Sequence, residues 1–139
     1  MAKLFKLEVV TPMRKFFVGE VLSIVFETEN GQMGVMADHI PMLVANRDCT
    51  LKIECEKECK LAFITEGFIE ITTNKVTVIV DDALWNDEID VDMNLNKVKR
   101  AEEELSDPKN DLGMKAELQA SIRRYNARIK TAGTMNNRN

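Results

Sequence analysis

Closely spaced basic residues near the end of the chain are its strongest candidates for chemistry. Arg124 and Arg128 lie four residues apart, so in a helix both would lie on one face. Two guanidinium groups placed in this way can bind phosphate or carboxylate oxygens through charge-assisted hydrogen bonds. Lys115, Arg123 and Lys130 extend the same positive segment. The segment predicts either a docking site for an acidic partner or a solvated helix face, and we favour docking because the local charge is one-sided.

Residues that usually carry catalysis are few and widely separated. The single histidine, His39, has no accompanying acid and nucleophile in a catalytic pattern, and no serine lies in a nucleophile-elbow sequence. The six glycines form no phosphate-binding loop. Cys55 and Cys59 flank a Glu-Lys-Glu turn, yet a structural zinc site needs about four ligands. We therefore expect neither an enzyme nor a metal-binding protein.

The two parts of the chain differ in charge. Residues 1–88 contain nine Lys and Arg against fifteen Asp and Glu, a net charge of −6, whereas residues 89–139 contain ten against eight, a net charge of +2. This distribution lacks the concentrated basic face of a nucleic-acid-binding protein. Three cysteines, with no signal-peptide or membrane-spanning pattern, favour a cytoplasmic protein that reaches a membrane only through a partner.

The elements that must position these residues begin with short strand patterns, which predict a β-sandwich of about eight strands. Asn-Gly at residues 30–31 suits a tight hairpin turn, because both positions tolerate positive φ. Two further hairpins are expected across residues 55–59 and 73–74, and residues 38–41 are expected to form a loop. The clearest strand patterns cover residues 4–10, 21–28, 32–36, 50–53, 60–65, 68–72 and 75–80.

Beyond residue 88 the hydrophobic period becomes that of helices. Two stripes with spacings of three and four predict two helices that pack as an antiparallel hairpin. Asp90 is the expected N-cap of the first helix and Gly133 the expected end of the second, followed by a frayed tail over residues 134–139. The expected seam consists of Val91, Leu95, Val98, Ala101 and Leu105 on the first helix and Leu118, Ile122, Tyr125, Ile129 and Ala132 on the second.

The sequence thus predicts two units. Residues 1–86 form the β-sandwich, and residues 87–139 form the helical hairpin with its short tail. Each helix has one apolar stripe, so the hairpin should be less stable than the sandwich. A marginal, detachable element of this kind suits a conformational switch.

Several motifs follow one another in a specific order. Leu-Glu-Val-Val-Thr-Pro occupies residues 7–12, and Phe-Val-Gly-Glu-Val occupies residues 17–21. The most distinctive stretch is Gly-Val-Met-Ala-Asp-His-Ile-Pro-Met-Leu at residues 34–43, and Phe-Ile-Thr-Glu-Gly-Phe-Ile-Glu-Ile follows at residues 63–71. In this order and spacing the chain resembles bacterial F-type ATP synthase epsilon subunits over residues 4–133.

By this resemblance the chain is a non-catalytic subunit of the central stalk, packed on the gamma subunit and seated on the ring of membrane c subunits. The expected rotor contacts are Gln32, Met33, His39 and Pro41. Family members often carry a carboxylate at the position of Gln32, where an amide would hydrogen-bond instead of forming a salt bridge. We expect His39 to brace the loop around Pro41. The complex would hold the chain, as a peripheral protein, at the cytoplasmic side of the cell inner membrane.

The resemblance also implies two positions for the hairpin. Folded against the sandwich, it permits ATP hydrolysis. Extended along the stalk, it contacts the catalytic alpha and beta subunits and obstructs rotation in the hydrolysis direction. Docking on an acidic segment of a beta subunit would use Lys115, Arg123, Arg124, Arg128 and Lys130.

Some family members bind ATP in the folded hairpin through Ile-Asp-x-x-Arg-Ala and later arginines. The positions that match are Ile89, Asp90, Arg100, Arg124 and Arg128. The first arginine and the alanine of the motif are replaced by Met93 and Asn94. Losing one guanidinium contact removes about 1.5–3 kcal/mol, or one to two decades in affinity. We therefore expect weak or absent ATP binding, and no other cofactor.

The alternative is a free-standing β-sandwich adaptor whose helical hairpin binds an unrelated protein. A beta-subunit reading frame beside this one in the genome would favour the stalk subunit, and its absence would favour the adaptor.

Overall fold

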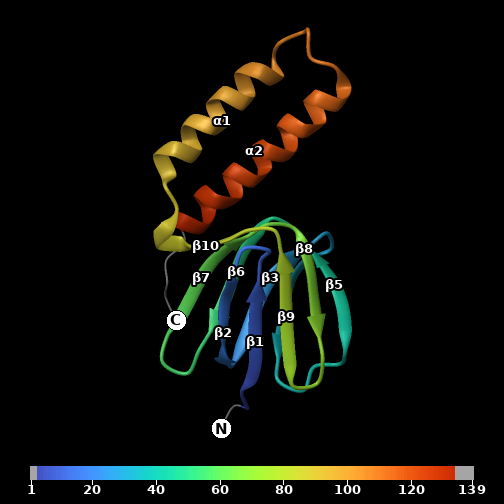
Figure 1. Ribbon diagram of the computed structural model, residues 1–139, viewed down its shortest axis with the longest axis vertical. Helices are drawn as coiled ribbons and strands as arrows, with labels where there is room; N and C mark the ends of the chain where they lie inside the picture. Colours follow the sequence, from blue (N-terminus) through green and yellow to red (C-terminus); the bar gives the residue numbers. More distant parts are fainter. Residues whose placement is uncertain (1–2, 134–139) are drawn as a thin grey trace.

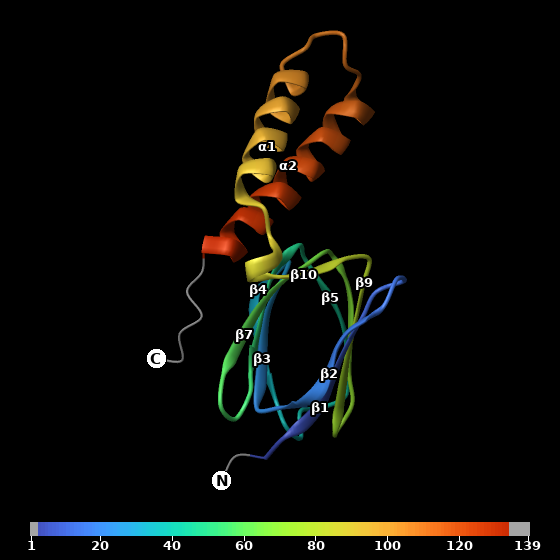
Figure 2. The same cartoon turned by 60° about the vertical axis from the view of Figure 1, so that its left-hand side comes forward.

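The computed structural model describes residues 3–133, and the tail expected at residues 134–139 lies outside them. Two five-stranded sheets are followed by two helices, which confirms the predicted fold class (Figure 1 and Figure 2). The strands are β1 (Phe5–Val10), β2 (Lys15–Val21), β3 (Ser23–Thr28), β4 (Gly31–Met36), β5 (Met42–Asn46), β6 (Cys49–Glu54), β7 (Cys59–Ile64), β8 (Gly67–Ile71), β9 (Lys75–Val80) and β10 (Ala83–Trp85). The helical elements are η1 (Asn86–Glu88), α1 (Val91–Leu105) and α2 (Leu112–Gly133).

The two sheets form the layers of a sandwich. One has the strand order β2-β1-β9-β8-β5, and the other has the order β10-β7-β6-β3-β4. Neighbouring strands are antiparallel, except that β1 and β9 pair in parallel. The parallel pair ties the start of the domain to its last long strand. Figure 2 shows the two layers nearly edge-on, with the hairpin beyond one end of both.

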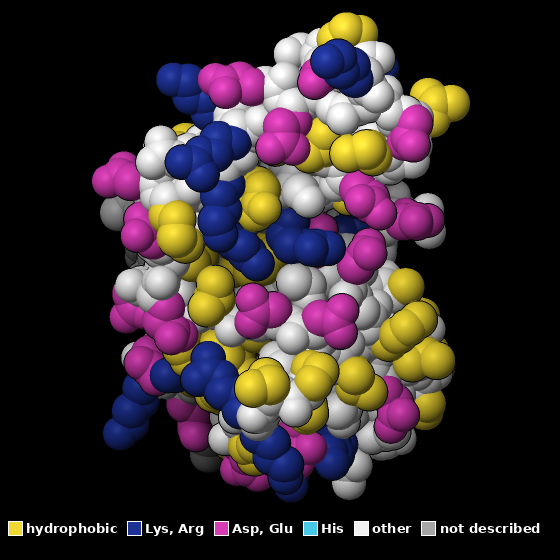
Figure 3. Space-filling model, turned by 45° about the horizontal axis from the view of Figure 1, so that its top comes forward, with side chains coloured by type: hydrophobic (Ala, Val, Ile, Leu, Met, Phe, Trp, Pro, Cys, Tyr) yellow, Lys and Arg dark blue, Asp and Glu magenta, His cyan; other side chains and the backbone are white. Residues whose placement is uncertain are grey.

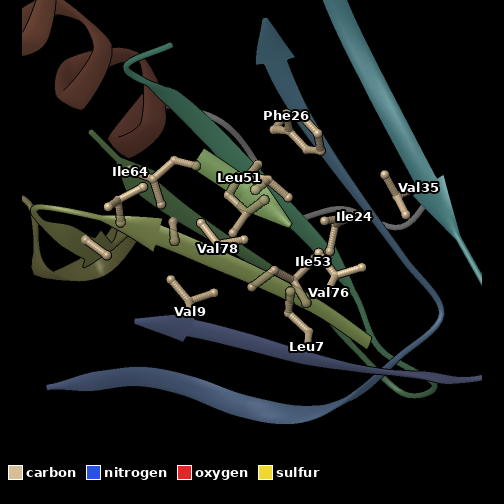
Figure 4. Packing of buried hydrophobic residues seen from close by; sticks show 14 of the residues in the cluster. Leu7, Val9, Ile24, Phe26, Val35, Leu51, Ile53, Ile64, Val76 and Val78 are labelled. Carbon is tan, nitrogen blue, oxygen red and sulfur yellow. The ribbon is translucent and has the colours of Figure 1, made fainter. Parts of the chain in front are cut away.

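Alternating side chains from both layers fill the core. Figure 4 shows Leu7 and Val9 of β1 pointing into the same interior as Leu51 of β6, and all three are fully buried. Burying one such side chain stabilises the fold by about 1.5–3 kcal/mol. The central cluster of buried residues runs from Phe5 to Ala83 along the chain. The core of the sandwich is therefore built without the helices.

The strand count differs from the prediction. Residues 3–133 form ten strands rather than about eight: β5 and β10 are additional, and the motif at residues 17–21 belongs to a separate strand, β2. β5 carries exposed apolar residues, so its pattern does not alternate, and β10 is only three residues long. The expected strand at 21–28 is interrupted at Leu22, whose N–H donates to the Glu54 carbonyl. The three expected hairpins, β3–β4, β6–β7 and β8–β9, are confirmed.

The helical hairpin stands on one end of the sandwich (Figure 1). α1 and α2 pack along each other, and the end of α2 packs on β6, β7 and η1. The side chain of Asp90 caps α1 as predicted, because its Oδ1 accepts from the Met93 N–H at 3.0 Å. Within residues 3–133, neither helix is both long and apolar enough to cross a membrane.

The seam predicted for the first helix is wrong at its first two positions. Val91 and Leu95 are 36% and 50% exposed, whereas Asn94 is only 2% exposed. Asn94 turns inward because its Nδ2 donates to the Asp90 carbonyl at 2.7 Å, which fixes the first turn where the helix leaves the sandwich. Farther along α1 the prediction holds at Ala101, which is buried.

Candidate functional site

The last turns of α2 are held on the sandwich partly by two hydroxyl groups. Thr131 is fully buried, and its Oγ1 lies 2.6 Å from Oγ1 of Thr50 on β6. The Thr131 hydroxyl donates within α2 to the Ala127 carbonyl, at 2.9 Å. Because a hydroxyl has one proton, Thr50 must donate in the pair with Thr131. This bond fixes the contact between α2 and β6.

One turn earlier, Arg128 contacts the sandwich in two ways. Its Nη2 lies 3.6 Å from Oδ2 of Asp82, in the turn after β9. Its guanidinium also lies over the rings of Phe63 on β7 and Tyr125 on α2, 5.1 Å and 5.9 Å from their centroids. Both distances permit a cation–π interaction. The Arg128 side chain, 16% exposed, is thus part of the interface between hairpin and sandwich.

Two further basic residues of α2 face acidic groups of the sandwich. Arg124 Nε lies 3.6 Å from Asp48 Oδ1, and Lys130 Nζ lies 3.9 Å from Glu27 Oε1. No local pattern in the sequence marks Asp48, Glu27 or Asp82 as partners of these basic residues. The only signal for them was the overall contrast between an acidic sandwich and a basic hairpin.

The five basic residues predicted to dock on a partner therefore do not form one free surface in this conformation. Arg124, Arg128 and Lys130 face the sandwich, whereas Arg123 is exposed and Lys115 is half-buried in the first turns of α2. Arg123 and Arg124 line a cleft of about 760 Å³ between α2 and the strand ends. Figure 3 shows basic and acidic side chains interleaved on this end of the molecule.

The residues proposed to hold ATP are only partly gathered. Ile89 is buried beside η1, and the carboxylate of Asp90 is occupied as the cap of α1. Arg100 is exposed on α1. Arg124 and Arg128 are near each other on α2, but both face carboxylates of the sandwich. A phosphate group would have to displace these carboxylates, so the set fits ATP poorly.

The outer face of the sheet that contains β5, β8 and β9 carries an exposed apolar patch. Phe68 lies beside Ala45 on one side and Ile79 on the other, and Ile79 lies beside Val10. Phe68 and Ile79 are 55% and 50% exposed. Leu43 on β5 adds a side chain that is 69% exposed. Hydrophobic side chains also gather on the sandwich in Figure 3. Contiguous patches of this kind mark interaction surfaces.

Charged residues lie next to this patch on the same sheet. Glu8 of β1 lies 3.4 Å from both Lys6 and Lys75. Desolvation raises the pKa of the Glu8 carboxyl. The positive charges of Lys75 and Lys6 lower it by more, Lys75 having the larger effect, so the pKa lies below its usual value. Glu8 therefore stays ionised beside the patch at neutral pH.

The four predicted rotor contacts lie along the edge strand β4 and the loop that follows it. Gln32 is exposed near the β3–β4 turn, and Met33 is half-buried against the core. Beyond the other end of β4, His39 is half-buried and Pro41 is exposed. His39 Nδ1 lies 2.7 Å from the Ile40 carbonyl, which agrees with a bracing role. The structure therefore does not bring Gln32 and Met33 together with His39 and Pro41.

The loop itself is held in an unusual conformation. Asp38 has a φ of 64°, in the left-handed region that few residues other than glycine adopt. An ion pair with Lys3, at 2.9 Å, ties its side chain to the start of the chain. Ile40, two residues after Asp38, is 75% exposed. This end of the sandwich presents an apolar side chain on a fixed loop.

Comparison with known proteins agrees with this architecture. A family model described as the β-sandwich domain of the ATP synthase delta/epsilon chain matches residues 4–86. An ATP synthase epsilon chain of Caldanaerobacter subterraneus subsp. tengcongensis is 38% identical over 133 residues, which cover 95% of this chain and 96% of that relative. The chain belongs to the ATP synthase delta/epsilon family. Epsilon chains are non-catalytic subunits, so membership confirms the prediction that the chain is not an enzyme.

Further relatives extend the agreement. An ATP synthase epsilon chain of Ruminiclostridium cellulolyticum is 41% identical over 101 residues, covering 73% of this chain and 75% of that relative. A chain in the solved mitochondrial ATP synthase of Euglena gracilis, a structure of OSCP, F1 and the c-ring, has a TM-score of 0.80 at 20% identity. The match covers 89% of this chain and 78% of that chain. At this identity the likeness supports the fold.

Proposed function

We propose that this epsilon chain is a rotor subunit of the central stalk that couples the catalytic head to the c-ring through the gamma subunit. We further propose that its hairpin restrains ATP hydrolysis. The observation that carries the proposal is the exposed apolar patch on a sandwich whose core contains no residue of the helices. Such a domain can stay attached to a partner while the hairpin changes position.

The apolar patch around Phe68 and Ile79 is the surface we propose for the gamma subunit. Its exposed apolar area would be buried by a stable partner, and burial of apolar surface drives most protein association. A structure solved for Tetrahymena thermophila, described as the central stalk and c-ring, contains a chain with this fold at a TM-score of 0.66. That likeness, at 15% identity, supports the fold; the partner is our inference from the patch.

We assign the contacts with the ring and the neighbouring stalk surface to the two ends of β4. Gln32 near one end and Pro41 beyond the other are exposed, and His39 beside Pro41 is half-buried. Six strand residues separate the ends by about 17–20 Å, so one partner must follow the whole edge or two partners must share it. This arrangement would hold the chain peripherally at the cytoplasmic side of the inner membrane.

Restraint of hydrolysis would require the hairpin to leave the sandwich. Arg124, Arg128 and Lys130 would then lose their contacts with sandwich carboxylates and become available to acidic segments of the alpha and beta subunits. Arg123 and Lys115 would complete the docking surface. We expect ATP to play little part, because the arginines of the folded hairpin already have carboxylate partners. Calorimetry on the isolated chain should detect no micromolar ATP binding.

The decisive experiment adds the purified chain to a catalytic complex depleted of its epsilon subunit. We expect stoichiometric association with the gamma subunit and a lower rate of ATP hydrolysis. Phe68→Asp should abolish association, whereas Leu112→Asp, a matched change of an exposed apolar residue at the tip of the hairpin, should not. Removal of residues 89–139 should preserve association and relieve inhibition. A chain that neither binds nor alters hydrolysis would refute the proposal.

A further inference from the structure

We propose that Asp48 and Asp82 form a ligand-independent clasp that keeps the hairpin docked on the sandwich by pairing with Arg124 and Arg128. The clasp is defined here as these four residues. Its importance for regulation rests on the proposed function, but docking itself is a property of the isolated chain.

The spacing along α2 places the contacts on one face. Arg124, Arg128 and Thr131 follow one another at intervals of four and three, so they lie one above the other along the helix. All three meet the sandwich, through Asp48, Asp82 and Thr50 respectively. The two arginines reach acidic residues in different turns of the sandwich, so α2 is fixed at two separated points in addition to the hydroxyl pair.

The clasp is partly shielded from water. The side chains of Arg128 and Asp48 are 16% and 14% exposed, while those of Arg124 and Asp82 are 37% and 51% exposed. Ion pairs are weakened less by solvent when one partner is shielded. The Phe63 ring beneath the Arg128 guanidinium adds a contact that depends on the same docked position.

The clasp also explains how a nucleotide would be excluded. A phosphate that approached Arg124 or Arg128 would meet Asp48 or Asp82 at the same guanidinium groups. Repulsion between phosphate and carboxylate disfavours joint occupancy, so phosphate binding must open the clasp rather than tighten it. Nucleotide therefore has no means of strengthening docking in this chain through these two arginines.

The test uses the substitutions Asp48→Asn and Asp82→Asn in the full chain. Asp48 Oδ1 accepts from the Glu66 N–H at 2.8 Å, and Asp82 Oδ1 accepts from the Ala83 N–H at 3.0 Å. Asparagine keeps an acceptor oxygen at each position, so the change removes charge and spares the turn. The matched control is Asp38→Asn, which breaks the ion pair with Lys3 at the far end of the sandwich.

Amide hydrogen exchange of residues 124–133, followed by mass spectrometry, measures how often α2 opens. Each clasp substitution should raise the exchange rate about twofold to fivefold, and the double variant should show the product of the two effects. Asp38→Asn should leave the rate unchanged. Added salt should accelerate exchange in the wild type more than in the double variant, and millimolar ATP should not slow it.

The proposal is overturned if the double variant exchanges at the wild-type rate, or if Asp38→Asn accelerates exchange equally. Slower exchange of the wild type in ATP would also overturn it, because a ligand would then hold the hairpin. These outcomes are independent of association with the gamma subunit. A chain that shows the clasp but fails to bind a depleted complex would refute only the proposed function.

Discussion

At the scale of single residues, Gly67 occupies a position where no side chain fits. A Cβ at this site would lie 2.2 Å from the backbone carbonyl oxygen of Ile79 on the neighbouring strand. Since backbone cannot move aside without breaking the β8–β9 pairing, Gly67→Ala should lower the free energy of unfolding by about 2–4 kcal/mol. Urea denaturation measures this loss. Gly34→Ala, whose Cβ would meet nothing nearer than 3.9 Å, should change stability far less; equal losses would contradict the argument.

Cys49 is a residue whose protonation depends on folding. Burial raises the pKa of its thiol to about 11, whereas an exposed thiol has a pKa of about 8.5. The unfolded chain therefore releases the proton first, so this group's contribution to stability is complete below about pH 8.5 and is lost as the pH rises to about 11. Unfolding free energies measured across this range should fall less steeply in Cys49→Ala than in the wild type.

The same burial predicts how the three thiols react. Cys55 is half-buried, whereas Cys49 and Cys59 are buried. Because alkylation requires an accessible thiolate, iodoacetamide at pH 8 should modify Cys55 first and the other two only after unfolding. Mass spectrometry of the modified peptides gives the order. Rapid modification of Cys49 in the folded chain would contradict this assignment.

At the scale of elements, the start of α1 depends on one side chain. Asp90 Oδ1 accepts from the Met93 N–H, a bond that alanine cannot make, whereas the Asn94 side chain donates to the Asp90 backbone carbonyl, which alanine keeps. Asp90→Ala should therefore cost about 1 kcal/mol of helix stability. Circular dichroism at 222 nm during heating should show earlier melting of the hairpin. Asp92→Ala, which removes a first-turn carboxylate but no cap, should have a smaller effect.

The strands and helices also show which features of the fold could be predicted from the sequence and which could not. Turn dipeptides and strand rhythm located three hairpins, because those signals are local. β5 was not predicted because the adjacent Met42 and Leu43 are both exposed while Val44 packs against the core, so its apolar residues do not alternate. The inward turn of Asn94 and the acidic partners of the arginines depend on contacts between distant segments. In the sequence, only the contrast in charge between the two units indicates contacts between them.

At the scale of the whole molecule, the two units should unfold separately. The central core runs from Phe5 to Ala83, while the hairpin is held mainly by its own seam and by the end of α2. Trp85, the single tryptophan, packs on Phe16 with ring centroids 4.3 Å apart. Its fluorescence therefore reports the sandwich, whereas ellipticity at 222 nm reports chiefly the helices.

Urea should consequently produce two transitions that do not coincide, a departure from two-state unfolding. Ellipticity should fall first, as the helices separate and melt, and tryptophan fluorescence should change at higher urea. Asp48→Asn with Asp82→Asn should move the first transition to lower urea and leave the second in place, because neither charge supports the apolar core. Coincident transitions for both signals would mean that the hairpin and the sandwich are one cooperative unit. A hairpin tied so firmly to the sandwich could not leave it without unfolding the sandwich, the domain that we propose attaches the chain to its partners.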